Sequence, residues 1–241
     1  MLIQADASQL EWRTILELSC DQVGIEEVLN KEDTHSKNQS AFELPSRLIA
    51  KIYLFRTIFR GSGWSFANDA DFQHVSRDPQ FWDDLNVKFF SKYNGIDACH
   101  KRWAQLVMSG KPIEGPLGRQ WTINIPRDKQ GNLKCPWTTL TNYPVQGTGA
   151  DVMAIARVTF YKRIKKLGIS CKFISTVHDS IVVDIEPQYA QAVCDLFHQV
   201  FDDLIPNIKR MFGYDWKVPM ECEVKCGPDM KNMVKMKRLD K

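Results

Sequence analysis

Three adjacent polar residues, His178, Asp179 and Ser180, lie between two short apolar segments in the C-terminal third of the chain. The flanking segments are rich in β-branched residues, so residues 173–184 are predicted to form two strands joined by a tight turn. A carboxylate held at the apex of such a hairpin suits a group that binds a metal ion or a charged substrate. Asp and Ser are also common turn residues, so this segment alone is compatible with an ordinary turn.

A second carboxylate follows a short apolar run at the start of the chain. Residues 1–5 are predicted to form a buried strand that delivers Asp6 at its end. Ser8, with Glu11 three residues later, has the spacing of a capping box at a helix start. Two carboxylates on adjacent strands can hold a pair of divalent metal ions about 4 Å apart, an arrangement that serves in-line phosphoryl transfer.

A predicted helix between these two segments carries cations and aromatic rings on one side. Pro45 is tolerated in its first turn, and Gly61 ends the helical pattern. These cations and rings recur every four residues, and residues four apart are neighbours on a helix surface, so they form one stripe along the helix. The cations could hold phosphates and a ring could stack on a base, whereas a purely structural stripe would more often be apolar throughout. The stripe consists of Arg47, Lys51, Phe55 and Phe59.

The other expected elements indicate an α+β fold. The segment from 111 to 126 alternates apolar and polar residues between glycines, which predicts a hairpin. Pro144 and the group Gly147-Thr-Gly149 are expected to interrupt a long helix early. Helices are expected at residues 33–44, 45–60, most of 66–110 with breaks near 78–79 and 94–95, 138–167 and 187–204, and a late strand at 216–224.

Composition excludes several classes of protein. The 241 residues are 44% hydrophobic and 25% charged, with a net charge of +3. No apolar run reaches the roughly 18 residues of a membrane span, and the first residues lack the features of a secretory signal. The seven cysteines include no CxxC pair, so we expect reduced thiols and no structural zinc site. Basic residues gather at 162–166 and from 225 onward; such runs are usually solvated faces, but they also suit phosphate backbones.

Four motifs now occur in a recognisable order. They are Asp6-Ala-Ser-Gln-Leu-Glu-Trp-Arg13, Arg47-x3-Lys51-x3-Phe55-x3-Phe59-x-Gly61, Asn142-x-Pro-Val-Gln-Gly-Thr-Gly-Ala-Asp151 and Val177-His-Asp-Ser180. Together they resemble the first catalytic motif, the fingers helix, the primer-template helix and the second carboxylate motif of the family A DNA polymerases, the group of bacterial polymerase I and phage replicative enzymes. The resemblance implies a right-hand polymerase fold, with an antiparallel palm sheet and helical fingers. The expected division is palm at 1–33, fingers at 34–137, and palm again at 138–241.

The resemblance also implies roles for individual residues in template-directed DNA synthesis from dNTPs on a primer-template. Asp6, Asp179 and the backbone carbonyl of Ala7 would hold two Mg²⁺ ions. Lys51 would contact the triphosphate and could protonate the leaving pyrophosphate, and Glu11 would exclude ribonucleotides at the sugar 2′ position. Arg47 and His35 would also bind the triphosphate, and Phe55 and Phe59 would lie at the nucleotide. Near the minor groove and the primer end, amide donors would meet hydrogen-bond acceptors that are nearly the same for every base pair. The residues expected there are Gln9, Asn142, Gln146 and His178.

Several positions depart from the family pattern. Phe59 replaces the usual Tyr, and Arg60 stands where a small residue or Gly often follows. Ser180 stands where many members have Glu, so the third acid is either unnecessary or replaced by Asp184. Thr138 occupies a position where many relatives carry Arg. Phe55, rather than Tyr, implies discrimination against dideoxynucleotides.

The sequence also lacks parts of the family architecture. The first palm strands, the thumb and the exonuclease of family members would all precede Asp6, and the chain begins just before that residue. We therefore expect this chain to be the C-terminal half of a polymerase, with a second polypeptide supplying the thumb, the rest of the palm and possibly a 3′–5′ exonuclease. Without such a partner, the N-terminal strand would be an unpaired edge. The expected location is the cytoplasm, that of the host cell for a phage protein, with no membrane attachment.

Three other functions remain open from the sequence. A single-subunit RNA polymerase or reverse transcriptase shares the palm chemistry, although Glu11 argues against RNA synthesis. An HD-type phosphohydrolase would use His178 and Asp179, but such sites lie on helices with additional histidines, and this chain has five His in total. A nucleic-acid-binding fragment without catalysis is the third alternative, which the presence of both Asp6 and Asp179 disfavours.

Overall fold

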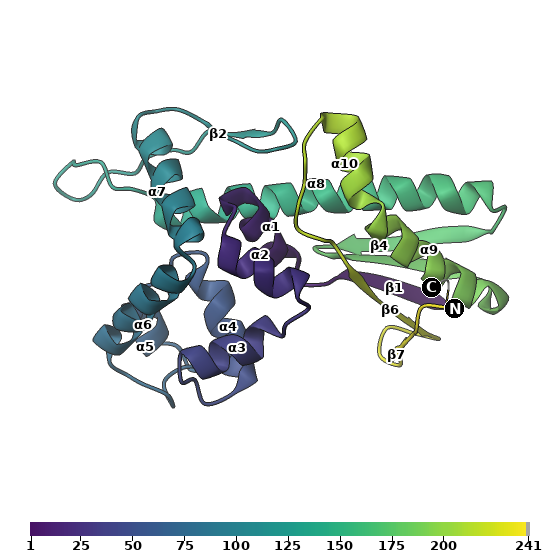
Figure 1. Ribbon diagram of the computed structural model, residues 1–241, viewed down its shortest axis with the longest axis horizontal. Helices are drawn as coiled ribbons and strands as arrows, with labels where there is room; N and C mark the ends of the chain where they lie inside the picture. The colour runs from purple at the N-terminus through teal and green to yellow at the C-terminus, as the bar shows by residue number, and fades with distance from the viewer. Residues whose placement is uncertain (240–241) are drawn as a thin grey trace. The chain divides into compact units, whose positions relative to one another are not determined.

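The computed structural model describes residues 1–239, which form two compact units (Figure 1). The first unit contains residues 1–10 together with the chain from Gly147 onward, and the second contains Glu11–Gln146. The boundary at Gly147 falls inside the long helix α8 (Trp137–Lys166). Within residues 1–239, no helix is both long and apolar enough to cross a membrane.

A five-stranded antiparallel sheet forms the centre of the first unit, which gives the expected mixed α and β architecture. The strand order is β4-β5-β1-β6-β7, so the strand at the start of the chain lies in the middle. The expectation of an unpaired N-terminal edge is therefore wrong, because two strands from the far end of the sequence flank β1. The strands are β1 (Leu2–Ala7), β4 (Cys171–Val177), β5 (Ser180–Ile185), β6 (Cys222–Gly227) and β7 (Val234–Lys235).

Alternation along β1 separates a core face from a polar face. Ile3 and Ala5 are fully buried, whereas Asp6 is part-exposed. Ile3 lies opposite Val183, and Val183 lies opposite Phe173, so these three residues share one face of the sheet. Because successive residues of a strand point to opposite faces, Asp6 lies on the other face.

Two helices cover the core face of this sheet. Phe160 of α8 packs against Phe173 of the sheet, with ring centroids 5.8 Å apart. Phe160 also stacks on Phe197 of α9 (Ala190–Asp202), with centroids 3.9 Å apart. Helices α8 and α9 cover only this face, and they do not cover the opposite face, on which Asp6 lies. A short 3-10 turn (Pro187–Tyr189) precedes α9, and α10 (Leu204–Phe212) follows it.

Helix α8 is continuous over 30 residues, so the expected early interruption is wrong. Pro144 lies inside the helix and is buried. Its ring removes the backbone bond that would reach the carbonyl of Leu140, a loss of roughly 3 kcal/mol in an isolated helix. Leu140, Val145 and Val152 are fully buried, and we attribute the continuity to this packing on both sides of the proline.

The second unit consists mainly of helices around an aromatic core. Tyr53 packs on Phe66, Trp82 and Phe89 with ring centroids 5.3 to 6.1 Å apart. The predicted break at residues 78–79 is confirmed, because Asp78 accepts a hydrogen bond from the backbone N–H of Gln80 and starts a helix there. The elements are α1 (Leu10–Ser19, whose first residue belongs to the first unit), α2 (Gln22–Leu29), α3 (Thr34–Ala41), α4 (Arg47–Thr57), α5 (Gly63–Ala67), α6 (Pro79–Lys92), α7 (Asn94–Met108), β2 (Ile113–Glu114) and β3 (Gln120–Trp121).

Two further expectations can be compared with the structure. The late strand predicted at residues 216–224 begins only at Cys222. Trp216, Val218 and Met220 are buried in alternation, but they do not belong to a strand. Buried alternation indicates packing, and a strand additionally requires a ladder partner. All seven cysteines carry free thiols, as expected.

Candidate active site

The two predicted catalytic carboxylates lie on neighbouring strands of the first unit. Strands β1 and β5 pair antiparallel with Asp6 opposite Ser180, one residue beyond Asp179. The backbone N–H of Ala7 donates to the carbonyl of Asp179 at 2.8 Å. The end of β1 and the turn before β5 therefore meet, and this register brings together the residues that sequence reasoning selected from the two ends of the chain.

The turn that carries Asp179 is a two-residue hairpin loop. His178 and Asp179 connect Val177 to Ser180, which pair with each other. His178 has a φ of 51°, in the left-handed region that a non-glycine residue rarely adopts. The hydroxyl of Ser180 donates to the carbonyl of Val177 at 3.1 Å, so this side chain closes the hairpin. Ser180, where the sequence departs from the expected family pattern, thus has a structural use.

Asp184 does not lie near the two carboxylates. It is opposite Leu2 at the other end of the β1–β5 ladder, four register positions from the pair Asp6 and Ser180. Its carboxylate accepts a hydrogen bond from the amino group of Met1 at 3.0 Å. The expectation that Asp184 could replace the third acid is therefore wrong, because an extended strand carries it away from the turn.

The segment after Asp6 is fixed by its backbone on both sides. Ala7 bonds to Asp179, and the N–H of Ser8 donates to the carbonyl of Glu221 at 2.8 Å. Gln9 then adopts a φ of 54°, and the chain enters α1 at Leu10. These bonds hold the backbone at Ala7, the predicted source of a carbonyl ligand, in a defined position.

Asp6, Asp179 and the carbonyl of Ala7 suit a hard divalent cation that is also coordinated by substrate phosphates. Within residues 1–239, no three or more His, Cys, Asp or Glu side chains form a group able to hold a metal ion. Mg²⁺ is commonly held by one or two carboxylates, with substrate phosphates and water completing the octahedron. Asp6, Asp179 and the carbonyl of Ala7 offer oxygen ligands of that kind.

The predicted stripe of cations and rings lies on α4 in the second unit. Its opposite face is buried through Ile49, Tyr53 and Leu54, which leaves the stripe on the accessible side. Lys51 is exposed and, within the described residues, forms no ion pair. Its ammonium is therefore available to an anion. Phe55 is part-exposed on the same stripe.

Arg47 at the start of α4 is held by a residue that sequence reasoning treated only as part of a helix. The side chain of Asp33 caps α3, and it also accepts hydrogen bonds from Arg47 Nε at 2.6 Å and Nη2 at 3.1 Å. The hydrogen bond from Arg47 holds the pKa of Asp33 far below its ordinary value. A guanidinium has five N–H donors, so this bidentate pair leaves donors of Arg47 for a phosphate.

His35 lies inside the second unit, with 3% of its surface exposed. Its ring is 6.1 Å from the ring of Phe55. Burial, followed by the nearby charge of Arg47, lowers the pKa of His35 from 6.5 to about 4. The imidazole is therefore neutral at pH 7 and can take part in a hydrogen bond without adding charge.

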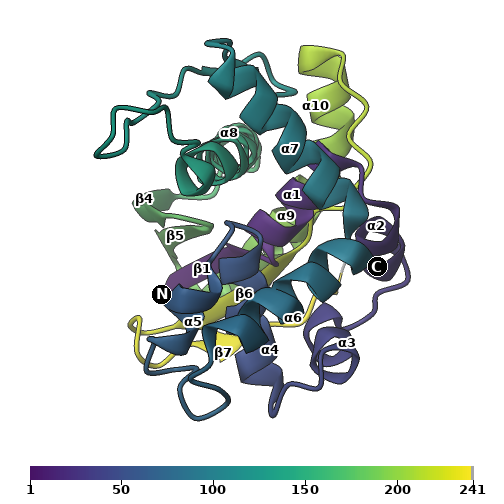
Figure 2. The same ribbon diagram turned by 90° about the vertical axis from the view of Figure 1, so that its left-hand side faces the viewer.

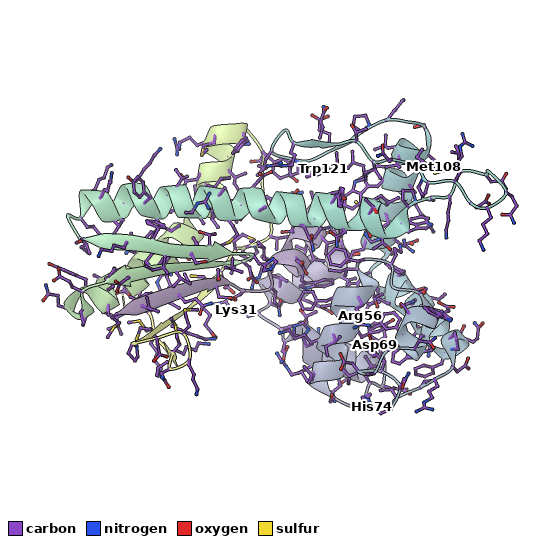
Figure 3. The ribbon with its side chains drawn as sticks, turned by 180° about the vertical axis from the view of Figure 1, so that it is seen from behind. Lys31, Arg56, Asp69, His74, Met108 and Trp121 are labelled. Atoms are coloured by element: carbon purple, nitrogen blue, oxygen red, sulfur yellow. The ribbon has the colours of Figure 1, made fainter. Side chains whose placement is uncertain are left out.

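Arg56 lies near the C-terminal end of α4 and contacts both an acidic residue and an aromatic ring. Arg56 pairs with Asp69 at 2.7 Å and lies over the ring of Phe72 at 5.1 Å. Figure 3 labels Arg56 and Asp69. Phe59, the last member of the predicted stripe, lies just beyond α4, which ends at Thr57. The stripe is thus helical for three of its four members.

Arg60 forms a cluster that sequence reasoning missed. Its φ is 60°, which explains why a glycine suits this position. Its guanidinium donates to Asp97 at 2.5 Å and to His100 Nδ1 at 3.1 Å. It also lies 3.9 Å from the ring centroid of Phe90 and 5.1 Å from that of Trp137. The departure at Arg60 was visible in the sequence, but its partners lie 30 to 77 positions away and had no local signal.

Three positions of α8 share a spacing of four residues. Thr138, Asn142 and Gln146 therefore lie on one side of the helix. Asn142 is part-exposed and Gln146 is exposed. The amide of Gln146 donates to Glu11 at 3.4 Å, so a residue predicted at the minor groove contacts a residue predicted at the sugar.

The sequence and the fold together define the class of this protein. The model of DNA polymerase family A matches residues 1–232, and the chain belongs to that family. The chain is 26% identical over 206 residues to DNA polymerase I of Aquifex aeolicus, covering 81% of this chain and 34% of the relative. It is 23% identical over 233 residues to the thermostable DNA polymerase I of Thermus aquaticus, covering 95% and 27%. The chain thus spans about a third or less of the length of these relatives.

A solved structure shares this fold. It is the polymerase domain of Pol1 from M. smegmatis, in complex with DNA primer-template and dNTP. The TM-score is 0.77 at 21% sequence identity, covering 94% of this chain and 39% of that one. This similarity confirms the predicted fold, a mixed α and β part of a family A polymerase domain.

Proposed function

We propose that this chain carries the nucleotidyl-transfer centre of a DNA polymerase that extends a primer with dNTPs. The observation that supports this proposal best is the register of β1 and β5, in which Asp6 and the turn residue Asp179 lie at one end of the ladder. The backbone bond from Ala7 to Asp179 at 2.8 Å supports it further. Family membership gives the reaction class.

The residues of this chain would position and neutralise the substrates. Asp6, Asp179 and the Ala7 carbonyl would hold two Mg²⁺ ions. When bound, these ions supply activation of the primer 3′ oxygen and stabilisation of the leaving oxygen. Lys51 would neutralise the triphosphate and donate a proton to the leaving pyrophosphate, with Arg47 and the neutral His35 as further contacts. Phosphoryl transfer depends mainly on such positioning and charge neutralisation.

Other residues would discriminate between substrates. Phe55 would lie against the nucleotide, with Phe59 nearby. Glu11 would exclude a 2′ hydroxyl, and the contact from Gln146 to Glu11 would orient its carboxylate. The remaining residues proposed to contact nucleotide or DNA are Gln9, Asn142 and His178.

We also propose a division of labour along the chain. Residues 1–33 and 138–241 would form palm, although 240 and 241 lie outside the described residues, and 34–137 would form fingers. A second polypeptide supplying the thumb remains part of the proposal, although the central position of β1 removes the unpaired edge as an argument for it. Primer extension by the purified chain alone tests this point, and processive synthesis without a partner would contradict it.

Two substitutions in one strand region test the catalytic role. Asp179→Asn removes a proposed metal ligand, and losing several kcal/mol of charge stabilisation corresponds to roughly a thousandfold loss of primer extension. Asp184→Asn makes the same charge change at the other end of the ladder, and we expect activity within a few-fold of the parent chain. Equal activity of the two variants would refute the assignment of Asp179. Comparing dNTP with rNTP incorporation separates DNA synthesis from RNA synthesis.

A further inference from the structure

The basic run at residues 162–166 has no part in the proposed reaction. It lies at the C-terminal end of α8 in the first unit. Figure 2 shows α8 almost end-on, with α10 to one side of it. A groove of about 420 Å³ separates these two helices. Lys162, Lys166 and Arg210 line it, and each is exposed. The groove therefore presents cations from two helices to one space.

The floor of this groove is apolar. Ile155 at its base is 8% exposed, whereas Val158 and Met211 are 47% and 53% exposed. Exposed aliphatic side chains beside a cluster of cations are not required for a solvated helix face. A contiguous apolar surface with a polar rim is typical of an interaction site.

A second groove, of about 520 Å³, continues from the first across α8. Val158 lines both grooves, and Tyr161 and Ile174 line the second one. Tyr161 and Ile174 are 44% and 54% exposed. Ile174 belongs to β4, one of the two edge strands of the sheet. The apolar surface thus extends from α10 over α8 to the sheet edge.

The charge of this surface has one sign. Among the residues that the structure describes, no Asp or Glu lines either groove. Lys162 and Lys166 form no ion pair within residues 1–239. Arg163 also lines the first groove, and it pairs at 2.6 Å with Asp203, which does not line it. The C-terminal turn of α8 adds the negative end of its helix dipole, but the unpaired ammonium groups dominate the field.

We propose that this surface, defined by the two grooves, docks an acidic amphipathic helix of a partner protein. The apolar side of such a helix would cover Val158 and Met211. Its carboxylates would pair with Lys162, Lys166 and Arg210. Helix-in-groove recognition combines these two features in one element.

The apolar floor distinguishes this partner from a nucleic acid. A phosphate backbone pairs with cations but gains nothing from aliphatic side chains, and stacking of bases requires aromatic platforms. Tyr161 is the one exposed aromatic residue in the lining of the described grooves. An acidic helix uses both the cations and the aliphatic residues, so it accounts for the whole surface.

Fluorescence anisotropy of two labelled 20-residue helical peptides with the full chain tests the proposal. One peptide carries Leu on one face and Glu on the other, and the second carries Leu and Lys. We expect the Glu peptide to bind and the Lys peptide to bind at least tenfold more weakly. Reversing two rim charges with K162E/K166E should weaken the Glu peptide about tenfold, since each rim pair changes from attractive to repulsive. Val158→Ser should weaken it with both lysines in place.

A matched variant controls for net charge. K129E/K134E makes the same charge change on two exposed lysines of the second unit, and it should alter affinity less than twofold. Circular dichroism checks that each variant is folded. Equal weakening by both pairs would refute the docking surface. Binding of K162E/K166E to single-stranded DNA and to phosphatidylserine vesicles is measured in parallel. If either falls more than binding to the Glu peptide, the proposal is refuted in favour of a nucleic acid or a membrane. Primer extension is not the readout, so the proposed function can fail independently.

Discussion

Replacing Arg60 separates the energy of its contacts from the cost of its backbone conformation. The side chains of Arg60 and Asp97 are 20% and 21% exposed, so their ion pair is partly shielded from water. This ion pair, the hydrogen bond to His100 and the stack on Phe90 each contribute about 1 kcal/mol, or together roughly 3 kcal/mol. The backbone of Arg60 has a φ of 60°, at which a residue with a Cβ atom incurs a steric cost of about 1 kcal/mol. A glycine at this position would avoid that cost.

These magnitudes predict an unusual order of stability. Arg60→Ala should lower the free energy of unfolding by about 3 kcal/mol, and Arg60→Gly by about 2 kcal/mol, because only the second relieves the backbone. Urea denaturation followed by circular dichroism measures both. The glycine variant should be the more stable of the two, although glycine is usually the worse residue near a helix.

Arg56 provides the matched control. It also has an ion pair and a ring contact, but it lies inside α4 with ordinary helical backbone. There Arg56→Gly should be less stable than Arg56→Ala by about 1 kcal/mol. The same order at both positions would refute the conformational argument for Arg60. An Arg60→Gly variant as stable as the parent chain would refute the contribution of the contacts.

Three further predictions concern substrate handling and pH. Phe59→Tyr restores the common family residue and should leave turnover within a few-fold in a primer-extension assay; a large loss would contradict the proposed placement of Phe59. Phe55→Tyr should increase incorporation of dideoxynucleotides relative to dNTPs in a competition assay, and an unchanged ratio would count against a nucleotide contact. Burial lowers the pKa of His35 to about 4 and of His100 to about 3. Since the unfolded chain gains these protons near pH 6.5 and the folded chain does not, stability should fall as pH decreases from about 6.5 to 4. The slope is about 1.4 kcal/mol per pH unit for each histidine, and a flat urea midpoint over this range would refute the buried neutral state.

Local signals were sufficient where the energetics are local. The hairpin around His178 and Asp179 was predicted because β-branched strands and a polar turn are contiguous in the sequence. The helix predicted from residue 33 begins there, because the side chain of Asp33 caps α3 and accepts the N–H of His35 at 3.2 Å. The ion pair of Asp33 with Arg47 was not predictable from spacing alone, because it connects two helices across a loop.

Long-range pairing decided what the sequence left undetermined. Position in the chain suggested that β1 was an edge strand, yet β5 and β6 supply ladder partners on both sides. Pro144 led to the prediction of an interrupted helix, because the helix propensity of proline is a local property. The burial of Leu140 and Val145, in contrast, depends on tertiary packing. The registers of β1 with β5 and β6 join residues more than a hundred positions apart.

The structure gives the departure at Ser180 a physical basis. A longer acidic side chain at that position could not make the short return bond to Val177 that the hydroxyl makes at 3.1 Å. That bond tightens a loop already strained by the positive φ of His178, and it thereby fixes the backbone of Asp179 between two restrained neighbours. Since Mg²⁺ commonly takes one or two protein carboxylates and completes its shell with phosphate and water, the proposed metal site would depend more on precise placement of Asp6 and Asp179 than on a third acid. Ser180→Glu should therefore lower hairpin stability without increasing primer extension, and a rise in activity of that variant would show that the third acid is needed.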